Sequence, residues 1–145
     1  MAAHVTPEEV IDRFWTGLTQ QAATEGWVVG RVRDSGFSRG FVLVRDPAVV
    51  EFKVRVSQVS PGFWGLPYGE AEAIVAGKKE HNVLLTSSDS GYVIRAARLP
   101  ILIGQFSKSD TQHSYKINEE KLRRERSHFR SLVDAWRLLR PADRA

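Results

Sequence analysis

The sequence contains no cysteine among its 145 residues. A chain without thiols forms no disulfide, no thiolate zinc site and no cysteine nucleophile. Long hydrophobic runs are missing as well. The apolar stretch 99–104 is interrupted by Pro100, and the first ten residues have neither the basic start nor the apolar run of a secretory signal. We therefore expect a cytoplasmic protein with no thiol chemistry, no export by that route and no membrane as a partner.

Several familiar catalytic motifs are also absent. The chain has no Gly-x-Ser-x-Gly, no Gly-x-x-x-x-Gly-Lys and no Gly-x-Gly-x-x-Gly. Its four histidines, His4, His81, His113 and His128, show no metal-ligand spacing. Serine hydrolases, nucleotide-driven enzymes and zinc proteins therefore find no support in this sequence.

Positive charge is present in excess and is unevenly placed. Residues 1–105 contain 11 Lys or Arg and 11 Asp or Glu, whereas residues 106–145 contain 10 and 6. The whole net charge of +4 therefore lies in the C-terminal part. A concentrated positive field attracts polyanions such as nucleic acid, although mild basicity also serves solubility alone.

The order of helical and strand patterns predicts an α/β (α+β) fold. Thr6, Pro7 and Glu9 form the start of a helix that Gly26 ends, and 145 residues with 42% hydrophobic content suffice for a single domain spanning 1–145. We expect a central mixed sheet of about five strands, with an N-terminal helix, a middle helix and a long C-terminal helix. The expected strands are 28–33, 41–45, 49–57, 81–87 and 91–96, with a brief edge strand at 115–117; the expected later helices are 70–79, 98–106 and 119–139.

One strand carries a pattern that suits catalysis. In 49–57, Glu51 and Lys53 point to one face while Val50, Phe52, Val54 and Val56 point to the other. A carboxylate two positions from a lysine can bind a divalent cation while the ammonium steadies a phosphate or an attacking water. A second acid is then needed. Asp34 follows the first strand and is the better choice, because Asp46 belongs to a turn in which aspartate is common anyway.

This order of elements resembles the PD-(D/E)XK nuclease superfamily, over about residues 6–96. The resemblance implies a magnesium-dependent phosphodiesterase in which Asp34 and Glu51 hold Mg²⁺ and Lys53 is the catalytic lysine. Glu9 on the first helix would match the additional acidic ligand of some members. The chain departs from the family pattern in one respect, since Arg33 and not proline precedes Asp34.

The same strand pattern has a simpler interpretation. Alternating charges are typical of a solvated strand face with cross-strand ion pairs. A second match, Glu119-x-Lys121, falls in the expected C-terminal helix, where side chains two apart do not share a face. The pattern therefore recurs easily by chance.

Two further features could contact nucleic acid. Trp64 lies with Phe63 and Tyr68 in 60–69, a stretch whose two prolines and three glycines predict a loop. The Trp64 ring could stack on bases, or it could instead fold back over the core. On the expected C-terminal helix, Arg123, Arg130 and Arg137 are seven residues apart and would lie on one face. With Arg126 beside them, they would form a basic stripe.

The sequence thus favours a small metal-dependent nuclease, or a degenerate relative, with nucleic acid as its partner and Mg²⁺ as its cofactor. The alternatives are a non-catalytic nucleic-acid- or protein-binding module and an immunity- or inhibitor-type partner protein anchored through Trp64. A homodimer is also open, because small nucleases that cut both strands commonly act as dimers.

Overall fold

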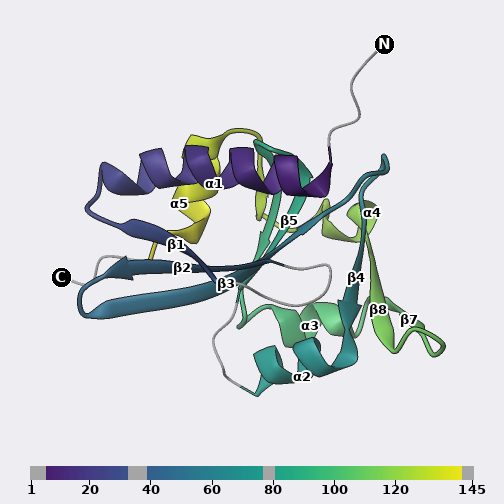
Figure 1. Cartoon of the computed structure of the whole chain (residues 1–145). Coiled ribbons are helices and arrows are strands. Elements are labelled where there is room, and N and C mark those ends of the chain that lie inside the picture. The colour runs from purple at the N-terminus through teal and green to yellow at the C-terminus, as the bar shows by residue number, and fades with distance from the viewer. Residues whose placement is uncertain (1–5, 33–38, 77–80, 142–145) are drawn as a thin grey trace, which may run out of the picture.

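The computed structural model describes residues 6–32, 39–76 and 81–141. Within these ranges the chain forms five helices and nine strands in an α+β arrangement, the class that the sequence predicted (Figure 1). In chain order the elements are α1 (Pro7–Ala23), β1 (Val28–Val32), β2 (Arg39–Arg45), β3 (Ala48–Val56), β4 (Phe63–Pro67), α2 (Tyr68–Val75), β5 (His81–Ser87), β6 (Ser90–Ile94), α3 (Leu99–Ile103), β7 (Ser107–Ser109), β8 (Ser114–Asn118), α4 (Glu119–Leu122), β9 (His128–Phe129) and α5 (Leu132–Leu139).

Helix α1 begins at the capping residues, as predicted. The hydroxyl of Thr6 accepts a hydrogen bond of 3.2 Å from the backbone N–H of Glu9, which satisfies one of the donors left free at a helix start. After the helix, Gly26 has a φ of +80°, a conformation that glycine adopts at little cost, and the chain turns there into β1. The buried stripe of α1 consists of Ile11, Phe14, Leu18 and Ala22.

The main sheet has six strands, one more than the sequence predicted. β1, β2 and β3 form an antiparallel meander, and β5 lies parallel to β3 on its other side. β6 and β9 then continue the sheet in antiparallel fashion, which gives the order β1-β2-β3-β5-β6-β9. The parallel pair requires a crossover, and β4 and α2 supply it. The succession of helix, meander, helix and strand is therefore the expected one, with β4 inserted.

A second sheet of order β4-β8-β7 corrects two predictions. The stretch expected to be a loop contains β4, in which the alternating residues Trp64 and Leu66 are buried. Pro61 precedes this strand and Pro67 ends it, so neither removes a backbone donor from its middle. The brief edge strand expected at 115–117 is part of β8, which is the central strand of this sheet.

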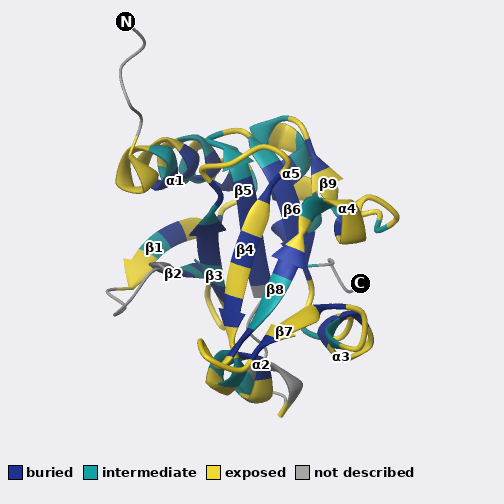
Figure 2. Ribbon diagram, turned by 90° about the vertical axis from the view of Figure 1, so that its right-hand side faces the viewer, coloured by how far each residue is buried: buried dark blue, intermediate teal, exposed yellow. Residues whose placement is uncertain are grey.

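Two hydrophobic clusters lie on the two faces of the main sheet. The first packs α1 and α5 against one face and includes Phe14, Phe52 and Trp136. The second lies between the other face and the layer formed by β4, β8 and α3, and includes Trp64 and Leu102. Figure 2 shows the resulting band of buried residues through β5 and β6, with exposed positions on the outer elements.

The C-terminal segment is not the single long helix predicted for 119–139. It forms α4, strand β9 and α5 in succession. Phe129 pairs with Gly91 at the edge of the main sheet, a pairing that a helix excludes, and it is 1% exposed there. Ser131 then starts α5 by accepting a hydrogen bond of 3.2 Å from the backbone N–H of Asp134. The segment thus follows its strand pairing at Phe129 and not the helical periodicity of the sequence.

Within the described ranges, no helix combines the length and the apolar character needed to cross a bilayer.

Candidate functional site

Glu51 and Lys53 project from one face of β3. Phe52 and Val54 are buried in the cluster under α1, so the residues that alternate with them face the opposite way. On that opposite face Glu51 is exposed and Lys53 is half-buried. The structure therefore places this carboxylate and this ammonium side by side on a surface that solvent reaches.

The described ladder positions beside these two residues carry no second carboxylate. Glu51 lies opposite Val42 of β2, and Lys53 lies between Gly40 of β2 and Asn82 of β5. The described strands β2 and β3 contain Glu51 as their one acidic residue. A second acid near Glu51 would have to come from outside this strand pair.

The other two expected metal ligands are not placed beside Glu51 by the described residues. Asp34 lies outside the ranges that the structure describes. Glu9 lies on α1, which covers the Phe52 side of the sheet, whereas Glu51 projects from the other side. In 6–32, 39–76 and 81–141, no group of three or more His, Asp or Glu side chains could hold a metal ion. The described side chains alone therefore do not form a Mg²⁺ site, and one would need a ligand from outside the described ranges.

The second Glu-x-Lys match has a structural role. One carboxylate oxygen of Glu119 accepts a hydrogen bond of 2.8 Å from the backbone N–H of Gly62, and the other accepts one of 2.8 Å from the hydroxyl of Tyr92. The backbone hydrogen bond from Gly62 is the main cause that lowers the pKa of Glu119. Burial and the bond to Glu119 together raise the pKa of Tyr92 to about 12. Glu119 thus joins α4 to β6 and to the segment before β4.

Trp64 is not the exposed aromatic platform or interface anchor that the sequence suggested. Its side chain is 2% exposed, and its indole N–H donates a hydrogen bond of 3.2 Å to the backbone oxygen of Leu85. Its ring meets that of Tyr92 edge to face at 6.1 Å. Trp64 therefore closes the second core, which is the alternative that the sequence left open. Phe63, on the outer face of β4, is 42% exposed.

The predicted arginine stripe does not form, because its residues do not share a helix. Arg123 caps α4, Arg126 lies between α4 and β9, Arg130 precedes α5, and Arg137 lies within α5, where it pairs with Asp134 at 3.7 Å. All four side chains are exposed. Arg123 and Arg130 both act electrostatically to lower the pKa of Tyr92, so each lies within electrostatic reach of this residue of β6.

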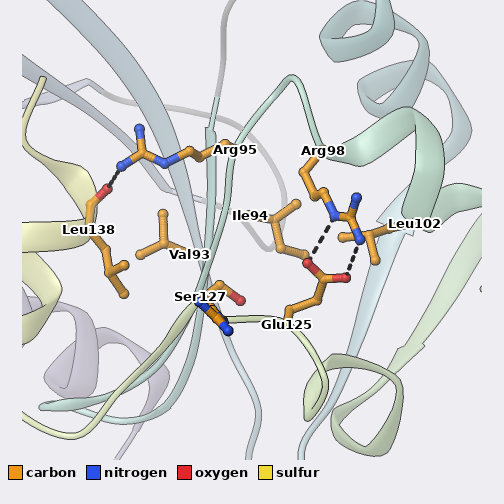
Figure 3. Close-up of a pocket in the computed structure, with 9 residues that line it drawn as sticks. Val93, Ile94, Arg95, Arg98, Leu102, Glu125, Ser127 and Leu138 are labelled. Atoms are coloured by element: carbon orange, nitrogen blue, oxygen red, sulfur yellow. Dashed lines mark hydrogen bonds and ion pairs between the residues drawn. The ribbon is translucent and has the colours of Figure 1, made fainter. Parts of the chain in front are cut away.

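Arg126 instead belongs to a basic pocket that sequence reasoning missed. The pocket has a volume of about 210 Å³ and lies between β6, α3 and the connection from α4 to β9 (Figure 3). Its lining residues are Val93, Ile94, Arg95, Arg98, Leu102, Glu125, Arg126, Ser127 and Leu138. The pair of arginines directly after a strand, Arg95 and Arg98, was the signal in the sequence that could have indicated this pocket.

The basic pocket is positively charged, with three arginines and one carboxylate in its lining. Arg98 donates hydrogen bonds of 3.0 and 2.9 Å to the two oxygens of Glu125, which raises the pKa of Arg98 and lowers that of Glu125. Arg95 donates to the backbone oxygen of Leu138 (Figure 3). The hydroxyl oxygen of Ser127 is buried and has no hydrogen-bond partner in the described part of the chain. Such a pocket can accept a phosphate of a nucleic-acid backbone.

Comparisons with known proteins add one likeness in structure. No protein-family model matches the sequence, and no curated protein does. Among solved structures, the Holliday junction resolvase Hjc from the archaeal hyperthermophile Archaeoglobus fulgidus is similar, with a TM-score of 0.46 and 12% sequence identity. The alignment covers 82% of this chain and 96% of the resolvase. A likeness at this level assigns no function to this chain.

Proposed function

We propose that this protein acts on nucleic acid as a phosphodiesterase of the PD-(D/E)XK nuclease type, with Asp34, Glu51 and Lys53 as its reacting groups. The proposal rests on one observation: Glu51 and Lys53 lie on the same solvent-accessible face of β3. This strand ends an antiparallel meander and lies beside the parallel strand β5, the order of elements that the sequence pattern implied.

The chemistry follows from the two side chains on β3. The ammonium of Lys53 would neutralise charge that develops on the attacked phosphate, and the carboxylate of Glu51 would orient a water and accept its proton. A divalent cation held by Asp34 and Glu51 would supply Lewis-acid polarisation of the phosphodiester.

The basic pocket would hold the nucleic acid beside this face. Lys53, Asn82 and Ile94 are successive partners across β3, β5 and β6, and Ile94 lines the pocket. Two strand spacings, on the order of 10 Å, therefore separate the Lys53 backbone from that of Ile94. One strand of nucleic acid that contacted both places would gain electrostatic affinity from each phosphate contact.

The enzyme assignment is tested by cleavage of plasmid, single-stranded DNA and RNA with Mg²⁺ or Mn²⁺. Replacing the proposed reacting lysine, Lys53→Met, should reduce the rate about 100-fold, the usual cost of losing one charge-stabilising donor. Lys121→Met, in the structural Glu-x-Lys match, is the matched control and should keep the wild-type rate. Equal activity in the wild type and Lys53→Met would remove the catalytic assignment.

The acidic ligands are tested in the same assay. Asp34→Asn and Glu51→Gln should each abolish metal-dependent cleavage, whereas Glu9→Gln, on the opposite side of the sheet from Glu51, should retain it. If Glu9→Gln loses activity and Asp34→Asn keeps it, Glu9 and not Asp34 is the metal ligand.

A second candidate is a nucleic-acid-binding module that does not cleave. The positions beside Glu51 and Lys53 on β2 are Val42 and Gly40, and this lack of a carboxylate favours it. Binding that weakens steeply with salt, with no product at any metal concentration, would support this candidate over the first. Light scattering of the free and bound protein would show whether a homodimer forms in either case.

A further inference from the structure

Arg55 is a buried cation on the same strand face as Lys53. It is 6% exposed, and it forms an ion pair with Glu70 in the first turn of α2. The Nη2 atom makes this ion pair, whereas the Nε atom on the same edge of the guanidinium has no hydrogen-bond partner in the described part of the chain. Burial lowers the pKa of Arg55 to about 10, which reflects the cost of removing its charge from water. An anion that replaced the Glu70 carboxylate and placed two oxygens on the Nε–Nη2 edge would offset this cost.

Arg55 also lines an open groove. The groove has a volume of about 560 Å³, within the range of roughly 300 to 1,000 Å³ that is typical of small-molecule sites. Its residues come from the end of β3, from β4, from the β7–β8 connection and from the start of β8: Arg55, Val56, Phe63, Trp64, Gly65, Pro67, Gln112 and Ser114. We call this surface the Arg55 groove.

The lining of the groove combines two kinds of recognition. Arg55 provides the planar donor edge that suits bidentate contact with a phosphate, and Gln112 and Ser114 add neutral polar groups. Phe63 is 42% exposed and offers a ring face on which a base can stack. The groove thus combines hydrogen-bond donors that suit an oxyanion with an exposed aromatic ring. These two features match the phosphate and the base of a nucleotide.

We propose that the Arg55 groove binds a phosphate-bearing nucleotide, whose phosphate takes the place of the Glu70 carboxylate against Arg55. The choice of a nucleotide rests on the proposed action on nucleic acid, but binding in this groove does not require catalysis. Glu70 then acts as an internal competitor that keeps the arginine paired when no ligand is bound. The phosphate comes either from a free mononucleotide or from the 5′ end of a chain, and both present the same chemistry.

The experiment measures calorimetric binding of AMP, adenosine and inorganic phosphate to the full chain. Glu70→Gln removes the competing charge and should bind AMP about tenfold more tightly than the wild type, as expected for one charge-assisted hydrogen bond. Glu25→Gln is the matched control, because Glu25 also pairs with an arginine, Arg140 at 2.9 Å, but lies outside the groove. This control should bind AMP as the wild type does.

Two further variants address Arg55 itself. Arg55→Gln combined with Glu70→Gln removes both charges together and should lose AMP binding. Arg55→Lys keeps the charge but not the two-donor edge and should bind AMP more weakly than the wild type, so it decides the point if the double variant does not fold. Circular dichroism checks the folding of each variant.

The outcomes separate cleanly. The inference is overturned if Glu70→Gln binds AMP no better than the wild type, if the Arg55 variants bind it equally well, or if adenosine binds as tightly as AMP. Tighter binding of a 5′-phosphorylated oligonucleotide than of its 5′-hydroxyl form assigns the site to a chain end, and tight binding of AMP alone assigns it to a free nucleotide. If cleavage depends on Lys53 but AMP binding does not depend on Arg55, this inference fails and the proposed function stands. If AMP binding depends on Arg55 but cleavage does not depend on Lys53, the proposed function fails and this inference stands.

Discussion

The hydroxyl of Tyr92 donates a hydrogen bond of 2.8 Å to Glu119, and so ties the sheet strand β6 to the start of α4. The second carboxylate oxygen of Glu119 accepts from the backbone N–H of Gly62 at 2.8 Å. One half-buried carboxylate thus connects three segments that are far apart in the sequence. Its charge is part of the connection, because both partners donate to it.

Glu119→Gln should therefore destabilise the protein in a pH-dependent way, by about 1 to 3 kcal/mol near neutral pH. The folded state lowers the pKa of Glu119 from its ordinary value of 4.5, with the Gly62 hydrogen bond as the largest cause. Its contribution is complete above pH 4.5 and is lost as the pH falls through the lowered pKa of the folded state. Urea unfolding at pH 7 and pH 3 measures this. Glu120→Gln, at the exposed neighbour, is the control, and an unchanged gap between wild type and Glu119→Gln at the two pH values would contradict the prediction.

Trp64 should matter for stability and not for nucleic-acid contact. Trp64→Ala should cost about 3 to 5 kcal/mol, because it empties a buried site in the second core. Trp64→Phe keeps most of the ring but loses the hydrogen bond to Leu85, and should cost less. It should leave the affinity for 5′-hydroxyl nucleic acid unchanged, because such a chain lacks the phosphate proposed for the Arg55 groove. Thermal unfolding and fluorescence anisotropy measure the two effects. A large loss of affinity in a well-folded Trp64→Phe protein would show that the tryptophan reaches the ligand after all.

Arg126 and Arg137 should differ in their effect on nucleic-acid binding. Arg126 lines the basic pocket, whereas Arg137 lies on α5 and pairs with Asp134. Arg126→Ala should weaken binding uniformly across sequences and reduce the slope of log affinity against log salt by about 1. Arg137→Ala should leave that slope unchanged. The same slope in Arg126→Ala and the wild type would exclude the basic pocket from the interface.

Glu125 should restrain binding at the same pocket. It is the acidic residue in the lining and is held by Arg98 through two hydrogen bonds. Glu125→Gln should raise nucleic-acid affinity about two- to fivefold at low salt, because the local positive potential increases, and the gain should vanish as salt screens it. Titrations at 50 and 500 mM salt test this, with Glu25→Gln as the control. A fall in affinity would mean that Glu125 orders Arg98 for binding and does not compete with the ligand.

Local patterns in the sequence determined α1 and the three strands of the meander. The cap at Thr6 and the apolar stripe from Ile11 to Leu18 depend on residues within one or two turns of each other. The alternation that turns Glu51 and Lys53 outward on β3 is equally local. Such features can be predicted because they follow from the helical and strand periods alone.

Tertiary structure decided the features that depend on distant partners. Trp64 is buried because β4 pairs with β8 and lies over β5. The helical pattern of 119–139 is interrupted where Phe129 pairs with Gly91 at the edge of the main sheet. Arg126 joins Arg95 and Arg98 only once β6, α3 and the α4–β9 connection meet, and Arg55 meets Glu70 only across the crossover. Periodicity shows which face of an element is apolar, but the identity of the element that covers this face is set by packing over the whole chain.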